Sequence, residues 1–305
     1  MTNPVRRSTL ILPVNIPRFV EKAYLRGADA VMLDLEDAVP LKEKESARRL
    51  IKDSLSLAGR GGAEVLVRIN KDPGLLPEDL SASVYPGLNG ITLPKVESAE
   101  EVRSMEAQLA QMEAQRGLKA RAVRLDLLIE TPRGILNLRE IVVASKRIKT
   151  VSLGPEDYCL EIGVEPSSDG VELSYALSTL VTVCKANGVK PMGVLGSIGE
   201  FRDLQKFERA ASRARQMGCE GASCIHPDQV QVLNRVFSPD PGKVEYARRV
   251  VEAFAEGLKR GTASVNVDGQ MVDIPVYNRA RLILHRAEAI MEVERRKAEA
   301  LARLR

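Results

Sequence analysis

Eight short apolar runs, separated by longer stretches with helical periodicity, constrain the fold of this 305-residue chain more than any other feature. Each run is rich in Val, Ile and Leu and lacks strict polar–apolar alternation, which is typical of parallel strands that are buried on both faces. We therefore expect an α/β protein with a (β/α)₈ (TIM) barrel, and keep a doubly wound open sheet as the alternative. The runs span residues 9–12, 30–33, 65–69, 90–93, 125–129, 150–153, 189–192 and 222–225.

Helical periodicity and residues typical of helix starts support this alternation of strands and helices. The stretches 98–116 and 200–217 have the clearest helical periodicity. Ser98 and Glu101 have the spacing of a capping box at the start of the first of these stretches. Pro227 directly follows the last apolar run and its neighbouring histidine, where it fits the first turn of another helix.

The sequence pattern changes after residue 237. A Ser-Pro-Asp-Pro-Gly break at 238–242 precedes an amphipathic stretch at 243–260 and a final helical stretch from about residue 275 to the end. Between them, Asp268-Gly269 separates two alternating arms over 265–272, a strong signal for a two-residue hairpin. We therefore expect a barrel domain over 1–237 and a helix–hairpin–helix extension over 238–305, which buries little alone and packs on the barrel or, more specifically, on a neighbouring subunit.

Composition excludes several classes of function. The chain has 45 Lys+Arg against 41 Asp+Glu and no basic stretch interleaved with aromatic residues, so we expect no nucleic-acid partner. No apolar run approaches the length of a membrane span or a signal peptide, so we expect a cytoplasmic protein without a membrane partner. The two histidines are interpreted as structural or surface groups, and the four cysteines as buried, reduced thiols that form no zinc site. These residues are His226, His285, Cys159, Cys184, Cys219 and Cys224.

Charged residues follow five of the predicted strands, at the ends that face the active site of a barrel. Carboxylates that converge there repel one another unless a positive charge lies between them. Oxygen ligands without a His or Cys cluster favour a hard cation, Mg²⁺ before Mn²⁺, which takes one or two carboxylates and completes its coordination with water and substrate. The residues are Asp34, Glu36 and Asp37 at the second run, Arg68 at the third, Lys95 after the fourth, Glu130 after the fifth and Asp157 after the sixth.

Glu130 and Asp157 follow adjacent strands and suit this metal site, and Arg68 offers a planar donor for a substrate carboxylate or an oxyanion. Each residue taken alone has a simpler interpretation. An acidic residue after a strand often caps the next helix, Arg68 could be a structural ion-pair partner, and lysines such as Lys95 are mostly solvated. Asp34 directly continues its strand run and is equally compatible with a structural role. Taken together, these residues favour a functional site, because helix caps alone do not place charged residues at five strand ends.

Eight segments, in order along more than 260 residues, connect these positions to a known family. They are RSTLILP (7–13), LDLEDAV (33–39), VRIN (67–70), LPKVE (93–97), IETPRG (129–134), LGPEDY (153–158), IHPDQ (225–229) and GQMVD (269–273). In these segments the chain resembles the citrate lyase β-subunit (CitE-like) branch of the HpcH/HpaI aldolase superfamily, which also contains malyl-CoA and citramalyl-CoA lyases.

The resemblance implies a role for each residue of the cluster. Glu130 and Asp157 would bind Mg²⁺, with Mn²⁺ as an alternative, and Glu130 would also lie against the substrate. Arg68 would hold the oxo-acid part of the substrate, and Glu36 with Asp37 would position Arg68 and the water on the metal. Each of these positions matches the family's motif residue by residue.

Further residues and partners follow from the same resemblance. Asp273, in the extension, would be an acid/base residue inserted from a neighbouring subunit, and the protein would be a homotrimer or a hexamer. Arg7, Pro94 and Lys95 would contact the CoA thioester. The partners implied are an acyl-CoA thioester, a 2-oxo acid and, in a larger lyase complex, other subunits.

The implied reaction is cleavage of a 3-hydroxyacyl-CoA thioester of the citryl-CoA type to acetyl-CoA and a 2-oxo acid, which is oxaloacetate for citryl-CoA. The chain departs from the family at Val14, where a glycine is usual, and at 192–199, where MGVLGSIG replaces a D-x-x-Y-x-D pattern. The second departure leaves a citramalyl-CoA or malyl-CoA lyase as the alternative. A non-catalytic acyl-CoA-binding subunit is a further alternative, which the intact set of charges disfavours.

Overall fold

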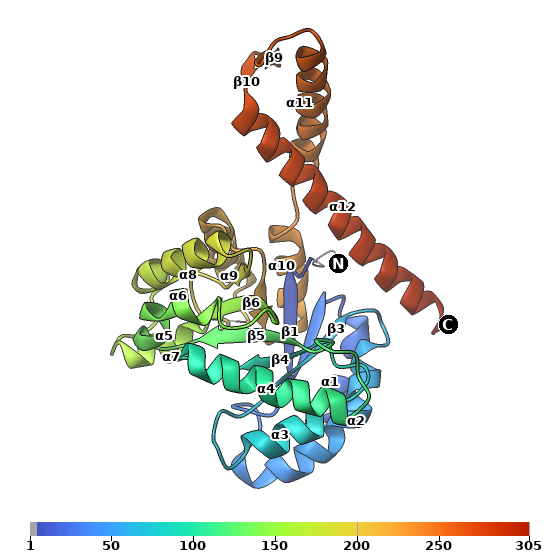
Figure 1. Ribbon diagram of the computed structural model, residues 1–305, viewed down its shortest axis with the longest axis vertical. Helices are drawn as coiled ribbons and strands as arrows, with labels where there is room; N and C mark the ends of the chain where they lie inside the picture. The colour runs from blue at the N-terminus through green and yellow to red at the C-terminus, as the bar shows by residue number, and fades with distance from the viewer. Residues whose placement is uncertain (1–4, 200, 305) are drawn as a thin grey trace. The chain divides into compact units, whose positions relative to one another are not determined.

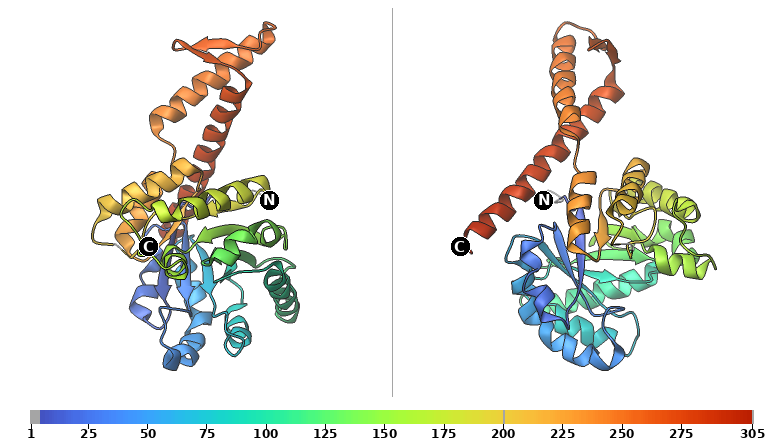
Figure 2. Two further views of the ribbon diagram at one scale, coloured as in Figure 1. Left: turned by 90° about the vertical axis from the view of Figure 1, so that its left-hand side faces the viewer. Right: turned by 180° about the vertical axis from the view of Figure 1, so that it is seen from behind.

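The computed structural model describes residues 5–199 and 201–304, which form two compact units, one mainly of residues 6–237 and the other mainly of residues 238–299. In this part of the chain the larger unit holds an eight-stranded sheet whose paired strands are all parallel (Figures 1 and 2). The strand order is β7-β6-β5-β4-β3-β2-β1-β8. The strands are β1 (Ser8–Pro13), β2 (Ala30–Asp34), β3 (Glu64–Arg68), β4 (Gly90–Leu93), β5 (Arg124–Ile129), β6 (Ile148–Leu153), β7 (Lys190–Met192) and β8 (Ala222–Cys224).

Two backbone hydrogen bonds connect the outer strands of this sheet. The Gly193 N–H donates to the Gly221 carbonyl and the Glu220 N–H to the Pro191 carbonyl, both at 2.9 Å. These contacts join the segments beside β7 and β8, so the sheet closes almost completely into a cylinder. The predicted (β/α)₈ barrel is therefore confirmed, and each of the predicted runs overlaps one observed strand.

Helices follow the strands around the barrel (Figure 1). The predicted capping box of Ser98 and Glu101 is present at the start of α4, and Pro227 begins α10 with His226 as its N-cap. The predicted start of a helix at Glu200 lies outside the described residues. That helix begins at Leu204, because the Asp203 carboxylate caps it by accepting a 2.9 Å hydrogen bond from the Lys206 N–H. The α-helices of the unit are α1 (Pro17–Val20), α2 (Lys44–Gly59), α3 (Leu76–Ser83), α4 (Ala99–Gln115), α5 (Pro132–Leu136), α6 (Leu138–Ile141), α7 (Pro155–Glu161), α8 (Ser174–Ala186), α9 (Leu204–Met217) and α10 (Pro227–Val236).

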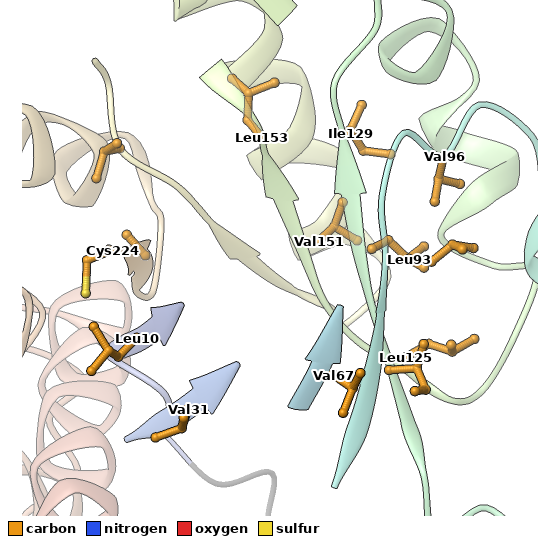
Figure 3. Packing of buried hydrophobic residues seen from close by; sticks show 14 of the residues in the cluster. Leu10, Val31, Val67, Leu93, Val96, Leu125, Ile129, Val151, Leu153 and Cys224 are labelled. Atoms are coloured by element: carbon orange, nitrogen blue, oxygen red, sulfur yellow. The ribbon is translucent and has the colours of Figure 1, made fainter. Parts of the chain in front are cut away.

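Side chains alternate between the two faces of each barrel strand. One set of alternate residues packs with residues of the surrounding helices into a single large core, and Figure 3 shows several of them, such as Leu10, Val31 and Val67. The other set includes Thr9, Met32 and Arg68 and lines a cavity inside the barrel. The strand pattern therefore produces a core outside the cylinder and a hollow within it.

The smaller unit contains α11 (Pro241–Lys259), β9 (Val265–Val267), β10 (Gln270–Val272) and α12 (Ile274–Ala302). Asp268 and Gly269 have φ values of +52° and +81°, as a two-residue hairpin turn requires, so the predicted hairpin is confirmed. Phe254 stacks on Tyr277 with ring centroids 4.6 Å apart, in a small apolar cluster belonging to this unit alone. Packing of the extension on a neighbouring subunit stays a prediction.

Two predictions from composition concern the described residues as a whole. The four cysteines are buried free thiols, as expected, and burial raises the pKa of Cys184 and of Cys219 to about 12. Within the described ranges, no helix combines the length and the apolar character that a membrane crossing needs.

Candidate active site

The carboxyl ends of β2 and β3 bring a partly buried arginine against a group of carboxylates. Arg68, the last residue of β3, donates from Nε to Asp34 Oδ1 at 2.7 Å and from Nη2 to Asp34 Oδ2 at 2.6 Å. Its Nη1 lies 2.8 Å from Glu36 Oε2 and 3.4 Å from Asp37 Oδ2. The sequence predicts that Glu36 and Asp37 position Arg68, but the two-point contact comes from Asp34. This bidentate pair fixes the plane of the guanidinium.

Asp34 also folds the loop that follows β2. Its carboxylate accepts hydrogen bonds from the Glu36 N–H at 2.9 Å and the Ala38 N–H at 3.0 Å. Lys44, at the start of α2, donates from Nζ to the Leu35 and Glu36 carbonyls at 2.6 Å each. Asp34 is fully buried, and its one side chain fixes both the conformation of the loop and the orientation of the Arg68 guanidinium. Sequence reasoning left a structural role open for Asp34 but did not identify Arg68 as its partner. The last inward-facing position of the strand, which Asp34 occupies, is a usable signal for the direction of its side chain.

Glu130 follows β5 and is held in a tight backbone environment. Its carboxylate is buried and accepts a 2.8 Å hydrogen bond at Oε2 from the Lys95 N–H. The Gly154 backbone lies directly against the same side chain, because a Cβ at Gly154 would be 2.5 Å from Glu130 Cγ and 2.7 Å from Oε1. A glycine is therefore required after β6 for Glu130 to occupy its position, a requirement that the sequence alone did not indicate.

Lys95 extends into the space between the acidic residues. It has a φ of +51°, which non-glycine residues rarely adopt, and its carbonyl accepts a 2.5 Å hydrogen bond from Lys71 Nζ. Its ammonium lies 3.5 Å from Glu36 Oε1 and 3.6 Å from Asp157 Oδ1. Asp157 is in the first turn of α7, which follows β6. Lys95 thus takes part in the cluster with both its backbone and its side chain, and Pro94 is the buried residue before it.

The electrostatics of these groups show an excess of negative charge. Burial, together with the neighbouring Asp157 carboxylate, raises the pKa of Glu130 to about 8. Burial also raises the pKa of Glu36 to about 7, although the Arg68 charge acts against it. Burial alone would lower the pKa of Arg68, but its hydrogen bonds to Asp34 and the nearby carboxylates raise it. Carboxylates that hold protons near neutral pH are poised to exchange them for a cation.

A cavity of about 370 Å³ opens beside this cluster and continues into the barrel. Its lining includes Arg68, Glu130 and Asp157 at the carboxyl ends of the strands, and Arg6 and Asp126 toward their amino ends. Two buried oxygens of residues that line this cavity, Thr92 Oγ1 and Asp126 Oδ2, have no hydrogen-bond partner among the described residues.

The available side-chain ligands suit Mg²⁺ better than a metal ion that takes all its ligands from the protein. Among the described residues no group of three or more His, Cys, Asp and Glu side chains is placed to hold a metal ion. Two carboxylates suffice for Mg²⁺, which keeps water and substrate oxygens in its remaining positions. Glu130 and Asp157 are close enough for the charge of one to raise the pKa of the other, and a lysine ammonium already lies beside Asp157. The residues therefore fit a divalent cation.

One predicted site residue lies at the other end of the barrel, and another belongs to the smaller unit. Arg7 precedes β1, at the amino end of the barrel, where its guanidinium binds Asp29 through Nε and Nη2 at 2.8 Å each. Asp273 belongs to the smaller unit, where Oδ1 accepts a 3.1 Å hydrogen bond from the Val276 N–H in the first turn of α12. Residue His226 caps α10 and stacks on a phenylalanine ring with centroids 5.3 Å apart, a structural position as expected.

Comparisons with known proteins show which family the sequence and the fold resemble. The sequence profile of the HpcH/HpaI aldolase/citrate lyase family matches residues 7–227. A citrate lyase subunit beta from Haemophilus influenzae is 34% identical over 288 residues, which cover 93% of this chain and 98% of that protein. A (3S)-malyl-CoA thioesterase from Cereibacter sphaeroides is 33% identical over 285 residues, covering 93% and 95%. The crystal structure of the protein CitE from Mycobacterium tuberculosis in complex with magnesium, acetoacetate and coenzyme A has a TM-score of 0.72 and 27% identity, covering 94% of this chain and 99% of that one.

Proposed function

Because the chain belongs to the HpcH/HpaI aldolase/citrate lyase family, we propose that it is a Mg²⁺-dependent carbon–carbon lyase acting on a 3-hydroxyacyl-CoA thioester of the citryl-CoA type. The products would be acetyl-CoA and a 2-oxo acid, oxaloacetate for citryl-CoA. One observation carries the proposal: a fixed guanidinium and two acidic residues with excess negative charge line the same barrel cavity, at the carboxyl ends of β3, β5 and β6. This is the arrangement that binding of an anionic oxygen ligand together with a cation requires.

Each residue of the cluster has a distinct part in the proposed reaction. Glu130 and Asp157 would hold Mg²⁺, which supplies Lewis-acid stabilisation of negative charge on the substrate hydroxyl oxygen. Arg68 would bind the carboxylate beside that hydroxyl, in the plane that Asp34 fixes. Loss of the hydroxyl proton to a carboxylate of the site allows the carbon–carbon bond to break. The electron pair of the broken bond stays on the α-carbon of the thioester fragment, which leaves as an enolate. This enolate takes up a proton to become acetyl-CoA.

Asp273 is the proposed donor of that last proton, from a neighbouring copy in a homotrimer or hexamer. Support comes from the resemblance of the GQMVD segment and from its place at the start of α12, in a unit separate from the barrel. An oligomer made only of Asp273→Ala chains, or only of Arg68→Ala chains, should be inactive. Mixed oligomers should regain activity, since some sites then combine an intact Arg68 with an intact Asp273, and absence of complementation contradicts a shared site.

The decisive experiment compares citryl-CoA, citramalyl-CoA and malyl-CoA with and without Mg²⁺, and identifies the products by mass spectrometry. A lyase yields acetyl-CoA and a 2-oxo acid, whereas a thioesterase yields free CoA and the intact hydroxy acid. Binding of all three thioesters without turnover, with and without the metal, would instead indicate an acyl-CoA-binding subunit. Removal of Mg²⁺ with EDTA should abolish cleavage, and full activity without the metal contradicts the assignment of Glu130 and Asp157.

A malyl-CoA or citramalyl-CoA lyase is the second candidate. The relative from Cereibacter sphaeroides is named for (3S)-malyl-CoA, and the segment 192–199 lacks the charged and aromatic pattern usual in the family. The reaction at the metal and at Arg68 is the same for these substrates, which differ only in the substituent on the hydroxyl-bearing carbon. The remainder of the cavity wall therefore decides between them.

A further inference from the structure

The loop after β4 contains a residue in a strained backbone conformation at the edge of the site. Lys95 has a φ of +51°, and the nearby Leu93 and Val96 are buried in the core around the barrel (Figure 3). The left-handed region is unfavourable for a residue with a side chain, so it persists only where the surroundings fix it. The conformation of Lys95 therefore depends on the contacts of its backbone.

Both polar groups of the Lys95 backbone bind side chains from neighbouring loops. Its N–H donates to Glu130 Oε2 at 2.8 Å, and its carbonyl accepts a 2.5 Å hydrogen bond from Lys71 Nζ. The next N–H, that of Val96, donates to the Leu128 carbonyl at 3.1 Å. A different φ or ψ at Lys95 would turn its N–H, its carbonyl and its side chain relative to one another. A change of backbone conformation therefore breaks at least one of these contacts.

Lys71 is itself held at both of its ends. Its backbone follows Asn70, whose N–H donates to the buried Asp79 carboxylate at 2.8 Å. Its ammonium lies 2.8 Å from Glu101 Oε1, and the other carboxylate oxygen of Glu101 accepts backbone hydrogen bonds at the start of α4. The hydrogen bond from Lys71 to the Lys95 carbonyl thus comes from a side chain whose position is fixed.

From this geometry we propose that Lys71 is a positioning residue of the site. Its ammonium holds the Lys95 carbonyl and, with it, the left-handed conformation of that residue. This conformation directs the Lys95 N–H to Glu130 and places the Lys95 ammonium near Asp157. Lys71 is absent from the described lining of the barrel cavity, so it acts through Lys95 rather than on the substrate. The inference rests on the proposed function, since Glu130 and Asp157 are the residues that would hold Mg²⁺.

The first test measures the affinity for Mn²⁺ alone by calorimetric titration, which needs no turnover. Lys71→Met removes the donor to the Lys95 carbonyl, so the Glu130 carboxylate loses a fixed partner and the affinity should fall by about tenfold. Lys71→Arg keeps a cationic donor at this position and should retain most of the wild-type affinity. An unchanged affinity in Lys71→Met, or an equal loss in Lys71→Arg, overturns the proposal.

Two control variants separate this role from an effect of net charge or of the ion pair. Lys119→Met removes the charge of an exposed lysine and should leave the affinity unchanged. Glu101→Gln removes the ion pair with Lys71 but keeps an oxygen that caps α4, so the affinity should fall by no more than about twofold. Urea denaturation should give each variant nearly the stability of the wild type, because the ion pair is partly exposed. A loss of affinity in Lys119→Met equal to that in Lys71→Met overturns the proposal.

A double-mutant cycle with Lys95→Gly tests the route by which Lys71 acts. Glycine adopts a positive φ without strain, so the left-handed conformation no longer needs support. Lys71→Met should then lower the Mn²⁺ affinity of the Lys95→Gly protein by no more than about twofold, compared with about tenfold in the wild type. A loss of about tenfold in both backgrounds overturns the proposal, because Lys71 would then act independently of the conformation of Lys95.

The turnover assay separates failure of this inference from failure of the proposed function. If Lys71→Met loses affinity as expected and the wild type cleaves none of the thioesters, the lyase proposal fails and the positioning role stands. If the wild type cleaves a thioester with Mg²⁺ and Lys71→Met keeps the wild-type affinity, the lyase proposal stands and this inference fails. A wild-type protein that binds no Mn²⁺ contradicts both.

Discussion

The two ends of the barrel both bury charged side chains, but they balance them differently. At the amino end Arg6 lies 2.9 Å from Glu64 Oε2 and 2.9 Å from Asp126 Oδ1, and Lys149 pairs with the same Glu64. At the carboxyl end carboxylates outnumber the cations. Burial acts to raise the pKa of both Glu64 and Glu130. The charges of Arg6 and Lys149 nevertheless lower the pKa of Glu64, whereas the pKa of Glu130 is raised to about 8.

This difference separates a structural cluster from a functional one. At the amino end acids and bases occur in equal number and neutralise one another, so the cluster closes the floor of the cavity and needs no further ion. At the carboxyl end the acidic groups outnumber the basic ones, and the excess is relieved either by the protons that Glu130 and Glu36 retain or by a bound cation. Substitutions at the two ends should therefore affect different measurements, activity and metal binding at one end and stability at the other.

The largest expected effect is on activity at the carboxyl end. Glu130→Gln should lower kcat/KM by about 10³-fold or more, because a ligand of the proposed metal ion is lost. The same substitution removes a buried carboxylate with a raised pKa, so the metal-free protein should remain folded with a free energy of unfolding at or above that of the wild type. Steady-state kinetics and urea denaturation test the two parts. Near-normal kcat/KM would contradict the metal site, and marked unfolding would place Glu130 among the structural charges.

The opposite result is expected at the amino end. Arg6→Met should lower the free energy of unfolding by about 3–5 kcal/mol, because it leaves the buried Glu64 and Asp126 carboxylates without their shared partner. Urea denaturation measures this effect. Arg48→Met is a useful comparison, since Arg48 pairs with the buried Asp79 on the outside of the barrel. A loss below about 1 kcal/mol for Arg6→Met would show that the floor cluster does not stabilise the fold.

The strands and the carboxyl-end residues could be predicted from sequence, because both depend on local patterns. An apolar run predicts a strand, and in a parallel barrel every strand ends on the same side. A charged residue just beyond a strand must therefore lie at the carboxyl end of the barrel. The same logic would have placed Arg7, which precedes its strand, at the other end of the barrel. The inward direction of Asp34 follows from the alternation along its strand, but its pairing with Arg68 and the contact of Gly154 with Glu130 could not be predicted. Each depends on which side chain of a neighbouring strand lies opposite. The chain's pairing pattern, rather than residue type, decides such contacts.

Gly154 offers a way to alter the carboxyl-end cluster without removing a charge. Gly154→Ala would place a Cβ 2.5 Å from Glu130 Cγ, so the Glu130 carboxylate must move while the charges of the cluster stay the same. The Gly154 backbone, at φ −91°, is open to alanine. We therefore expect the affinity for Mn²⁺ or Mg²⁺ to fall by about 10–100-fold with little change in unfolding. Calorimetric titration with the metal alone measures this effect, and an unchanged affinity would show that Glu130 tolerates displacement.

The smallest expected effect is a pH dependence of stabilisation by Mg²⁺. In the metal-free protein Glu130 has its pKa raised to about 8. Between its ordinary carboxyl pKa of 4.5 and about pH 8, the folded protein keeps a proton that the unfolded chain has lost, so the stability of the metal-free protein falls as the pH rises through this range. Mg²⁺ must displace this proton, so its affinity rises with pH up to the pKa and then levels off. The increase in Tm on adding saturating Mg²⁺ should be larger at about pH 8.5 than at about pH 6.5, by about 3 °C.

Glu130→Gln is the control for this pH dependence, since it removes this titrating group. It should leave a small increase in Tm that differs less between the two pH values, with the remaining difference coming from Glu36, whose pKa is raised to about 7. Thermal unfolding followed by circular dichroism provides the measurement for both proteins. A larger stabilisation by Mg²⁺ at the lower pH would reverse the sign expected for a raised carboxyl pKa. It would mean that the charges at the carboxyl end are neutralised within the protein, as they are at the amino end, and the contrast between the two ends would disappear.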